Sequence, residues 1–279
     1  MPEGDTVWLT AHRLDQALRD QRITVFDLRV PQLALADLRG ATVREVVARG
    51  KHILMRFDTG PRGSRGIAER SLRSDSAGWT LHSHLKLDGS WRVRPAAQAG
   101  RPGFDVRAVV GTSRHLCLGR RVHDLALAPT AAESQWVGHL GPDLLGPDWD
   151  ADVALANLRA DPERPVAEAL LDQRVLAGIG NMYAAEILFL HHTRPTSPVS
   201  ALPDPAAALD TAHRLLRLNR DHPAQSTTGL GRGAEHWVYA RAGEPCRRCR
   251  TPIVAGQIGT PPEHRTTFWC PRCQPEHSA

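Results

Sequence analysis

The sequence predicts an α+β protein with two domains and a small cysteine-bearing hairpin at its end. Short alternating apolar runs between residues 23 and 118 are typical of strands, and apolar positions after about residue 125 recur at helical spacing. Four cysteines form two C-x₂-C pairs near the end. A chain of 279 residues with 41% hydrophobic content can bury two cores. We divide it into residues 1–125, a linker 126–150, 151–237 and 238–279.

The first predicted element is a helix of about four turns that begins near Asp5. Val7, Ala11, Leu14 and Leu18 recur at helical spacing, and Asp5 is placed to cap the first turn. The strands that follow are expected in the runs TVFDLRV, TVREVV, HILMRF, WTLHSHLKL, SWRV and VRAVV. Glycine, proline and aspartate separate these runs, so they predict an antiparallel sandwich or barrel. The polar, Gly/Ser-rich residues 61–78 predict a long loop between two strands.

Helices are predicted in the second half of the chain, with short connections between them. The candidate ranges are 133–139, 150–159, 165–173, 182–191 and 205–219. From Val238 onward the sequence is strand-like, and its turns are marked by the cysteine pairs. This pattern predicts a β-hairpin at the end.

The composition favours an acidic partner and no membrane. The net charge is +5 and the pI is near 9.3. No apolar run approaches the roughly 20 residues of a membrane helix, and the start does not resemble a secretory signal, so we expect a cytoplasmic protein. Of 35 basic Lys and Arg residues, only Lys51 and Lys86 are lysine. These two positions are candidates for sites where an ammonium cannot be replaced by a guanidinium.

The cysteine pairs predict a structural zinc site. Four thiolates from two short turns suit tetrahedral zinc, and a disulfide framework is the less favoured alternative in a cytoplasmic chain. Cys117, in the apolar stretch His-Leu-Cys-Leu, is expected to be a small core residue rather than a nucleophile. The expected ligands are Cys246, Cys249, Cys270 and Cys273.

The segment LLDQRVLAGIGNMYAAEILF, residues 170–189, joins two apolar helices through AGIGN. Its glycines permit a tight turn, and Asn181 lies where the second helix starts. A helix N-terminus presents N–H groups to anions, so the turn could hold a DNA phosphate. An ordinary helix–turn–helix corner with Asn181 as its cap is the alternative.

Four motifs together resemble the formamidopyrimidine-DNA glycosylase and endonuclease VIII family of base-excision repair enzymes. They are MPEG, RGKHILMRF, AGIGNMYAAEILF and HRTTFWCPRCQ, in the expected order along the whole chain. The resemblance implies a catalytic β-sandwich, a helix-two-turn-helix motif and a zinc β-hairpin. It also implies a monomer that binds double-stranded DNA containing damaged bases or abasic sites, with no organic cofactor.

The family resemblance gives the terminal residues a catalytic role. After removal of Met1, the amine of Pro2 would attack the sugar carbon that bears the damaged base. An α-amine titrates near 8, so roughly a tenth is neutral at pH 7, whereas a free lysine has well under 0.1%. The secondary amine yields an iminium ion, which permits β,δ-elimination. Glu3 would be the acid/base. A mere processing signal is the alternative for Pro2.

The resemblance also implies several DNA contacts. Lys51 would contact phosphate or assist proton transfer, with a solvated surface lysine as the alternative. Asn181 and Arg265 would clamp phosphates beside the lesion. Arg174 is a weaker phosphate candidate, for which a surface arginine is the alternative.

A base that reacts must leave the duplex, and an apolar side chain can fill the gap. The loop SHLKLDGSW, residues 83–91, occupies the position of the family's filling loop. Leu87 would be the wedge, flanked by Lys86 and Asp88. The alternative places Leu87 in the core.

Two departures indicate the endonuclease VIII branch. SRHLCLGRRVHDL lacks the Asp-Pro-Arg-Arg-Phe-Gly-like stretch of the oxidised-purine branch, and TTGLGRGAEHW leaves little room for its long capping loop. Oxidised pyrimidines are therefore the expected substrates, and a formamidopyrimidine/8-oxoguanine-type purine glycosylase is the alternative. A non-catalytic damaged-DNA binder of the same fold, or a zinc-ribbon RNA-binding protein, would explain the charge and cysteines but not Pro2 and Glu3.

Overall fold

The computed structural model describes residues 2–59, 78–98, 100–261 and 264–276, and these form two compact units. Unit 1 contains Pro2 and the described residues from Thr6 to His139. Unit 2 contains Glu3–Asp5 and the described residues from Leu140 onward. The predicted loop 61–78 lies outside the described residues except for Gly78.

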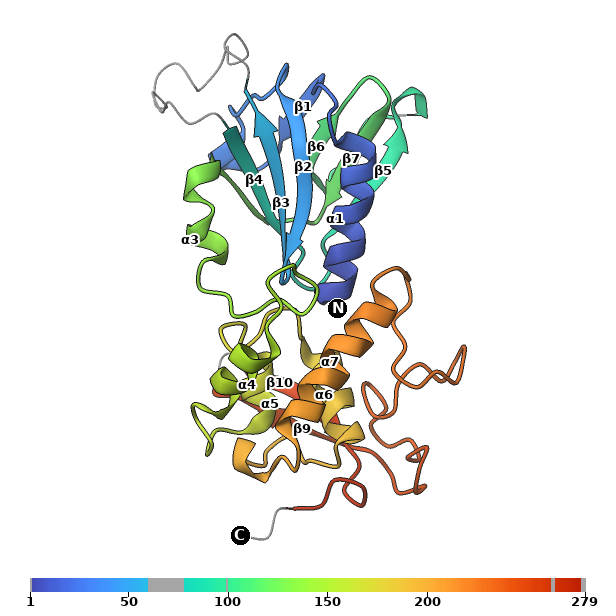
Figure 1. Ribbon diagram of the computed structural model, residues 1–279. Coiled ribbons are helices and arrows are strands. Elements are labelled where there is room, and N and C mark those ends of the chain that lie inside the picture. Colours follow the sequence, from blue (N-terminus) through green and yellow to red (C-terminus); the bar gives the residue numbers. More distant parts are fainter. Residues whose placement is uncertain (1, 60–77, 99, 262–263, 277–279) are drawn as a thin grey trace. The chain divides into compact units, whose positions relative to one another are not determined.

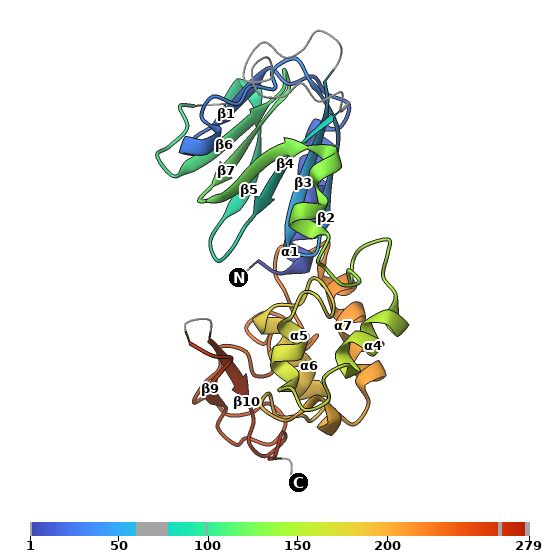
Figure 2. The ribbon, with the colours of Figure 1, turned by 90° about the vertical axis from the view of Figure 1, so that its left-hand side faces the viewer.

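Unit 1 is a sandwich of two antiparallel four-stranded sheets with a helix beside it (Figures 1 and 2). One sheet has the strand order β1-β6-β7-β5 and the other β2-β3-β4-β8. The elements are α1 (Gly4–Leu18), β1 (Val25–Leu28), β2 (Thr42–Arg49), β3 (His52–Asp58), β4 (Gly78–His84), β5 (Ser90–Pro95), β6 (Val106–Gly111), β7 (His115–Arg120), β8 (Asp124–Pro129) and α3 (Ser134–Val137).

Side chains of both sheets and α1 form one core in unit 1. Phe26 of β1 meets Phe57 of β3 edge-on, with ring centroids 5.8 Å apart. Leu14 and Leu18 of α1 join this core, as the helical spacing predicts. Cys117 is fully buried there, and this burial raises the pKa of its thiol to about 12, so it is a core residue and no nucleophile.

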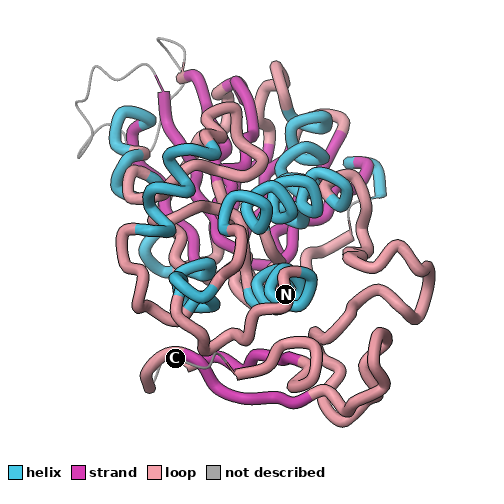
Figure 3. The backbone as a smooth tube through the Cα atoms, turned by 60° about the horizontal axis from the view of Figure 1, so that its bottom comes forward, coloured by secondary structure: helices cyan, strands magenta, loops and turns pink. Residues whose placement is uncertain are grey.

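Unit 2 consists of helices around one apolar helix, followed by a two-stranded hairpin. The elements are α4 (Ala151–Arg159), α5 (Val166–Leu171), α6 (Asn181–Leu190), α7 (Pro205–Asn219), β9 (Val254–Ile258) and β10 (Arg265–Trp269). Only Leu190 of α6 is not buried, which explains why its sequence shows apolar residues on every side. Strands β9 and β10 pair antiparallel, and Figure 3 draws them as magenta stretches of the backbone tube near the C-terminal end.

Three sequence predictions need correction. Residues 124–129 form β8 rather than the start of a helical region, because they pair with β4. Residues 238–253 are turns and loops, so strand structure begins only at Val254. Asp5 lies inside the first turn of α1, and its carboxylate accepts hydrogen bonds from Tyr183 and Gln225.

The expected linker is divided between the two units. Residues 126–139 belong to unit 1, and residues 140–150 belong to unit 2. Among the described residues, no helix is long and apolar enough to cross a membrane.

Candidate functional site

The carboxylate of Glu3 lies at the N-terminus of α6 and is fully buried. Its oxygens accept hydrogen bonds from the backbone N–H groups of Gly180 and Met182, each at 2.8 Å, and of Tyr183 at 3.4 Å. The first turn of a helix has N–H groups without partners inside the helix, and the helix dipole favours an anion there. The start of the chain therefore supplies the anion that the glycine turn was expected to receive from DNA.

The glycines of AGIGN allow this close approach. Gly178 has a φ of +112°, which a side chain would strain, and its carbonyl accepts the N–H of Gly4 at 2.9 Å. A Cβ on Gly180 would lie 2.5 Å from Cδ of Glu3. Gly180 thus leaves the space that the Glu3 carboxylate occupies.

Asn181 and the two predicted DNA-binding arginines lie in the same region of unit 2. Asn181 donates from Nδ2 to the carbonyl of Thr266 in β10 at 2.6 Å, so it ties α6 to the hairpin. Arg174 and Arg265 line one cavity of about 290 Å³. Arg174 also donates to both oxygens of Asp172, at 2.9 and 2.7 Å, which lowers the pKa of that carboxyl. The structure therefore brings the three residues together and shows that Arg174 has an acidic partner.

Lys51 lies in the turn between β2 and β3 in unit 1, directly after Gly50, whose φ is +56°. The next residue is His52, and its Nδ1 atom shares a hydrogen bond with Nε2 of His82 at 2.7 Å. His84 pairs with His52 across β3 and β4. Burial is the main cause that lowers the pKa of His52 to about 3 and of His84 to about 4, so both imidazoles are neutral beside Lys51 at pH 7.

The loop between β4 and β5 exposes its central leucine. Leu87 has 71% of its surface exposed, which excludes the core position considered as an alternative. Lys86 forms an ion pair with Asp124 at 2.9 Å, and Asp88 forms one with Arg121 at 3.5 Å. The charges on either side of Leu87 therefore have partners within unit 1.

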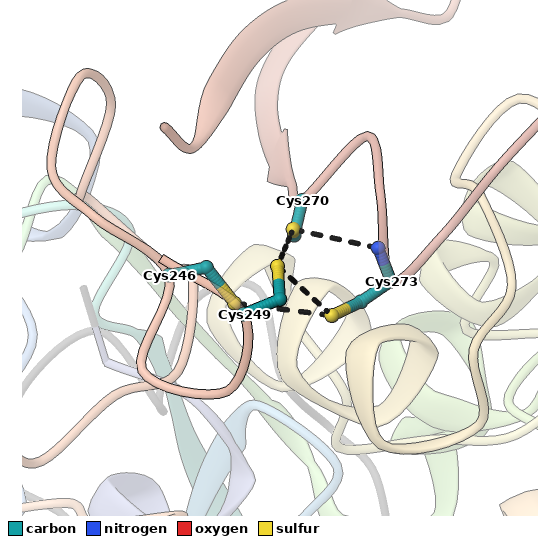
Figure 4. Close-up of side chains that lie close together, drawn as sticks. All are labelled: Cys246, Cys249, Cys270 and Cys273. Carbon is teal, nitrogen blue, oxygen red and sulfur yellow. Dashed lines mark hydrogen bonds between the residues drawn. The ribbon is translucent and has the colours of Figure 1, made fainter. Parts of the chain in front are cut away.

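The four sulfur atoms of the cysteine pairs lie within 4.8 Å of one another (Figure 4). The Sγ–Sγ distances are 3.9 Å for Cys246–Cys273, 3.4 Å for Cys249–Cys270 and 3.5 Å for Cys249–Cys273. Tetrahedral ligands with Zn–S bonds of about 2.3 Å lie roughly 3.8 Å apart. The backbone N–H of Cys273 points to Sγ of Cys270 at 3.5 Å, as expected for a stabilised thiolate. The donor set therefore fits a tetrahedral metal ion.

Sequence reasoning missed one residue that holds this part of unit 2 together. Glu186 of α6 is fully buried and accepts the backbone N–H groups of Trp237, Val238 and Tyr239 at 2.8, 2.8 and 2.9 Å, together with the hydroxyl of Thr227. A glutamate inside an otherwise apolar helix is the signal that could have indicated such a role.

Two family models match the chain. The formamidopyrimidine-DNA glycosylase N-terminal domain matches residues 1–131, and the formamidopyrimidine-DNA glycosylase H2TH domain matches residues 140–217.

Curated relatives match over nearly the whole length. "Probable endonuclease 8 2" from Streptomyces coelicolor is 48% identical over 98% of this chain and 94% of that protein. "DNA-(apurinic or apyrimidinic site) lyase Nei2" from Mycolicibacterium smegmatis is 44% identical over 98% of this chain and 99% of that protein. A formamidopyrimidine-DNA glycosylase from Corynebacterium jeikeium is 28% identical over 98% of this chain, so the first two are more similar.

Solved structures share the fold. A MutM complex with DNA containing carbocyclic 8-oxo-G has a TM-score of 0.76 at 23% identity and covers 99% of this chain and 100% of that one. The Lactococcus lactis Fpg complex with abasic-site DNA has a TM-score of 0.76 at 22% identity, with the same coverage. From its full-length relatives and both domain matches, the chain belongs to the formamidopyrimidine-DNA glycosylase and endonuclease VIII family.

Proposed function

We propose that the protein is a bifunctional DNA glycosylase and abasic-site lyase of base-excision repair. The observation that carries this proposal is the buried Glu3 carboxylate, which three backbone N–H groups hold at the N-terminus of α6. Pro2 precedes Glu3 directly in the sequence. The fixed carboxylate is therefore covalently attached to the proposed nucleophile.

Pro2 supplies the chemistry once Met1 is removed. Its neutral secondary amine attacks C1′ of the damaged nucleotide, and the C1′–base bond breaks. Opening of the sugar ring gives an iminium ion that joins the Pro2 nitrogen to C1′. The iminium withdraws electrons and acidifies the C2′ proton, so β-elimination expels the 3′ phosphate. A second elimination expels the 5′ phosphate, and hydrolysis releases the enzyme.

Glu3 serves this reaction as a fixed proton acceptor and donor. Hydrogen bonds from backbone N–H groups stabilise the ionised form of a carboxylate. An ionised Glu3 can stabilise positive charge that develops on the sugar and can then relay protons to the sugar and the departing base.

Residues of both units contact the DNA in this proposal. The Nδ2 atom of Asn181 has two hydrogens, and Thr266 takes one of them, so the other is available to a phosphate. Arg265 provides a guanidinium in the cavity it shares with Arg174. Lys51 contacts phosphate or assists proton transfer, and the exposed Leu87 fills the gap left by the extruded base.

We further propose that the metal is zinc and that the favoured bases are oxidised pyrimidines. Four cysteines within one tetrahedral cluster favour zinc. The absence of the arginine- and phenylalanine-bearing stretch and of a long capping loop supports the pyrimidine preference. The protein would act as a monomer on damaged double-stranded DNA in the cytoplasm, and residues 238–279 would form its zinc module.

Borohydride trapping tests the proposed chemistry. The protein is incubated with duplex DNA that carries thymine glycol or an abasic site, the imine is reduced, and the cross-linked peptide is identified by mass. We expect a covalent adduct at Pro2 with both substrates. No adduct with either substrate, in protein shown to lack Met1, would make the chain a non-catalytic binder.

Comparison of two lesions tests the pyrimidine preference. Single-turnover excision of thymine glycol is expected to be faster than excision of 8-oxoguanine opposite cytosine. Faster release of 8-oxoguanine would assign the chain a purine-type specificity instead.

A further inference from the structure

Asp5 is a second buried carboxylate near the start of the chain. Only 1% of its surface is exposed. Burying a carboxylate is costly unless its oxygens are hydrogen-bonded, and here both oxygens have donors. Tyr183 donates its hydroxyl at 2.7 Å, and Nε2 of Gln225 donates at 2.7 and 2.9 Å. Three segments of unit 2 therefore meet at Asp5: the start of α1, helix α6 and the chain after α7.

Tyr183 contacts both buried carboxylates. Its backbone N–H points to Glu3 at 3.4 Å, and its hydroxyl donates to Asp5 at 2.7 Å. Burial, together with the charges of Asp5 and Glu3, raises the pKa of Tyr183, so the phenol stays protonated and remains a donor. The same residue of α6 thus fixes the chain at two points that are two residues apart.

Glu3 depends on this second point of attachment. Its hydrogen bonds to Gly180 and Met182 are both 2.8 Å long, and Gly180 leaves it little spare room. The backbone N–H of Gly4 also donates to the carbonyl of Gly178 at 2.9 Å, so Glu3 and Gly4 both attach the start of α1 to the glycine turn. Asp5 adds contacts outside that turn, because Tyr183 lies in α6 and Gln225 lies in the chain after α7. These contacts limit rotation of the start of α1 about the turn.

We propose that Asp5 is a positioning residue that fixes Glu3 and the attached Pro2 for reaction by its hydrogen bonds to Tyr183 and Gln225. This inference rests on the proposed function, because Glu3 and Pro2 are its reacting groups. Asp5 acts through them and does not touch the DNA.

The test is the substitution Asp5→Asn, which keeps the shape of the side chain but turns one acceptor oxygen into a donor. The amide then faces donors, so one hydrogen bond is lost. We expect the single-turnover rate of base excision to fall about 100-fold, the scale of a misplacement of about 1 Å in an active site. Affinity for DNA with a non-cleavable abasic analogue should stay unchanged, because the proposed phosphate contacts are intact.

The rescue exchanges the carboxylate at position 5 with the carboxamide at position 225. In the double variant Asp5→Asn/Gln225→Glu, the new amide at position 5 can donate to the new carboxylate at position 225 and accept the hydroxyl of Tyr183. Most of the lost rate should therefore return. The single variant Tyr183→Phe, which removes one donor without adding another, should show a smaller loss than Asp5→Asn.

The matched control is Asp15→Asn in the same helix. Asp15 accepts from Arg19 at 2.8 Å and from the N–H of Val46 at 2.7 Å, within unit 1. This variant should excise bases at the wild-type rate. A comparable rate loss in Asp15→Asn would assign the effect of Asp5→Asn to stability rather than to positioning.

Amide hydrogen exchange separates this inference from the proposed function. The N–H groups of Gly180 and Met182 should exchange faster in Asp5→Asn than in the wild type, whether or not the protein excises a base. Wild-type protein without any activity would refute the proposed function but leave this exchange result standing. Unchanged exchange with an unchanged rate, or a loss that the double variant does not recover, would overturn the role of Asp5.

Discussion

At the scale of single residues, the proposed catalytic region depends on Gly180, which has no side chain. Gly180 has extended backbone angles that alanine can adopt, with a φ of −124°. A Cβ there would nevertheless lie 2.5 Å from Cδ and 2.7 Å from Oε1 of Glu3. The effect of a substitution at this glycine therefore comes from displacement of Glu3 rather than from backbone strain.

We expect Gly180→Ala to slow base excision about 100-fold, the cost of a misplacement of about 1 Å. Single-turnover excision of thymine glycol measures this effect. The control is Gly100→Ala, since a Cβ on Gly100 meets no atom within 4 Å. Equal rates for the two variants would contradict the steric explanation.

Loss of the Glu186 carboxylate should destabilise the chain segment that leads to the cysteines. The N–H groups of Val238 and Tyr239 both donate to Oε1 of Glu186. In Glu186→Gln, an amide nitrogen at this position would face these two donors and could not accept from them. Each of these two buried donors left without an acceptor costs about 1–3 kcal/mol, so the free energy of unfolding of unit 2 should fall by roughly 2–6 kcal/mol. Chemical denaturation, monitored by amide hydrogen exchange in unit 2, measures this change in the free energy of unfolding.

The comparison for this prediction is Glu244→Gln. Glu244 pairs with Arg241 at 2.9 Å, but 56% of its side chain is exposed. An exposed ion pair contributes about 1 kcal/mol or less. A Glu186→Gln variant as stable as Glu244→Gln would show that the three backbone contacts add little.

At the scale of elements, β3 and β4 carry neutral histidines between the turn of Lys51 and the loop of Leu87. His52 contacts His82 by a hydrogen bond, and its ring lies 5.0 Å from that of His84. Strand β3 follows Lys51 and strand β4 precedes Leu87. The two strands are thus linked by imidazoles as well as by backbone hydrogen bonds. Burial keeps the rings of His52 and His84 uncharged at pH 7.

The neutral histidines predict a pH dependence of stability. Burial lowers the pKa of His52 to about 3 and of His84 to about 4, whereas both titrate near 6.5 when unfolded. The unfolded chain therefore binds more protons below pH 6.5, so stability is complete above that value and declines as the pH falls toward 4. Each histidine contributes at most about 1.4 kcal/mol per pH unit.

Calorimetry at pH 7, 6 and 5 measures this decline, and His52→Asn should make it shallower. A wild-type transition temperature that rises between pH 7 and 5 would refute the prediction, as would parallel slopes for the two proteins.

At the scale of the whole molecule, the two units have separate cores, and the cysteine cluster belongs to the second. Cys246 and Cys270 pack with Phe189 of α6 and with Val238 and Ile253. Asn181 and Arg265 depend on the same region, because Asn181 binds the carbonyl of Thr266 in β10. A metal ion held by the four cysteines would therefore support the proposed phosphate contacts through the hairpin.

Removal of the metal by a chelator should unfold the hairpin and weaken DNA binding, while unit 1 keeps its thermal transition. Binding of structural zinc contributes about 10–16 kcal/mol in small zinc domains, which a hairpin of this size cannot replace by packing. Affinity for abasic-analogue DNA before chelation, after it and after addition of zinc measures the effect. Unchanged affinity in metal-free protein would contradict it.

The sequence by itself determined the order of most elements and the positions of the two cysteine pairs, and the resemblance of its MPEG motif to the family singled out Pro2 and Glu3 as candidates. The elements and the cysteine pairs depend on local periodicity and short spacing, both of which a single chain displays. It predicted the strands β1 to β6 and the helices α4 to α7 for this reason. None of the predicted runs covers β7 or β8, because residues 115–120 become a strand by pairing with β5 and β6, and residues 124–129 by pairing with β4.

Only the tertiary structure decided what the side chains contact. Glu3 meets Gly180 across 177 positions in the chain, and Asp5 meets Gln225 across 220. No local pattern encodes such distances. They follow from burial, since a carboxylate taken out of water must lie where the fold supplies donors.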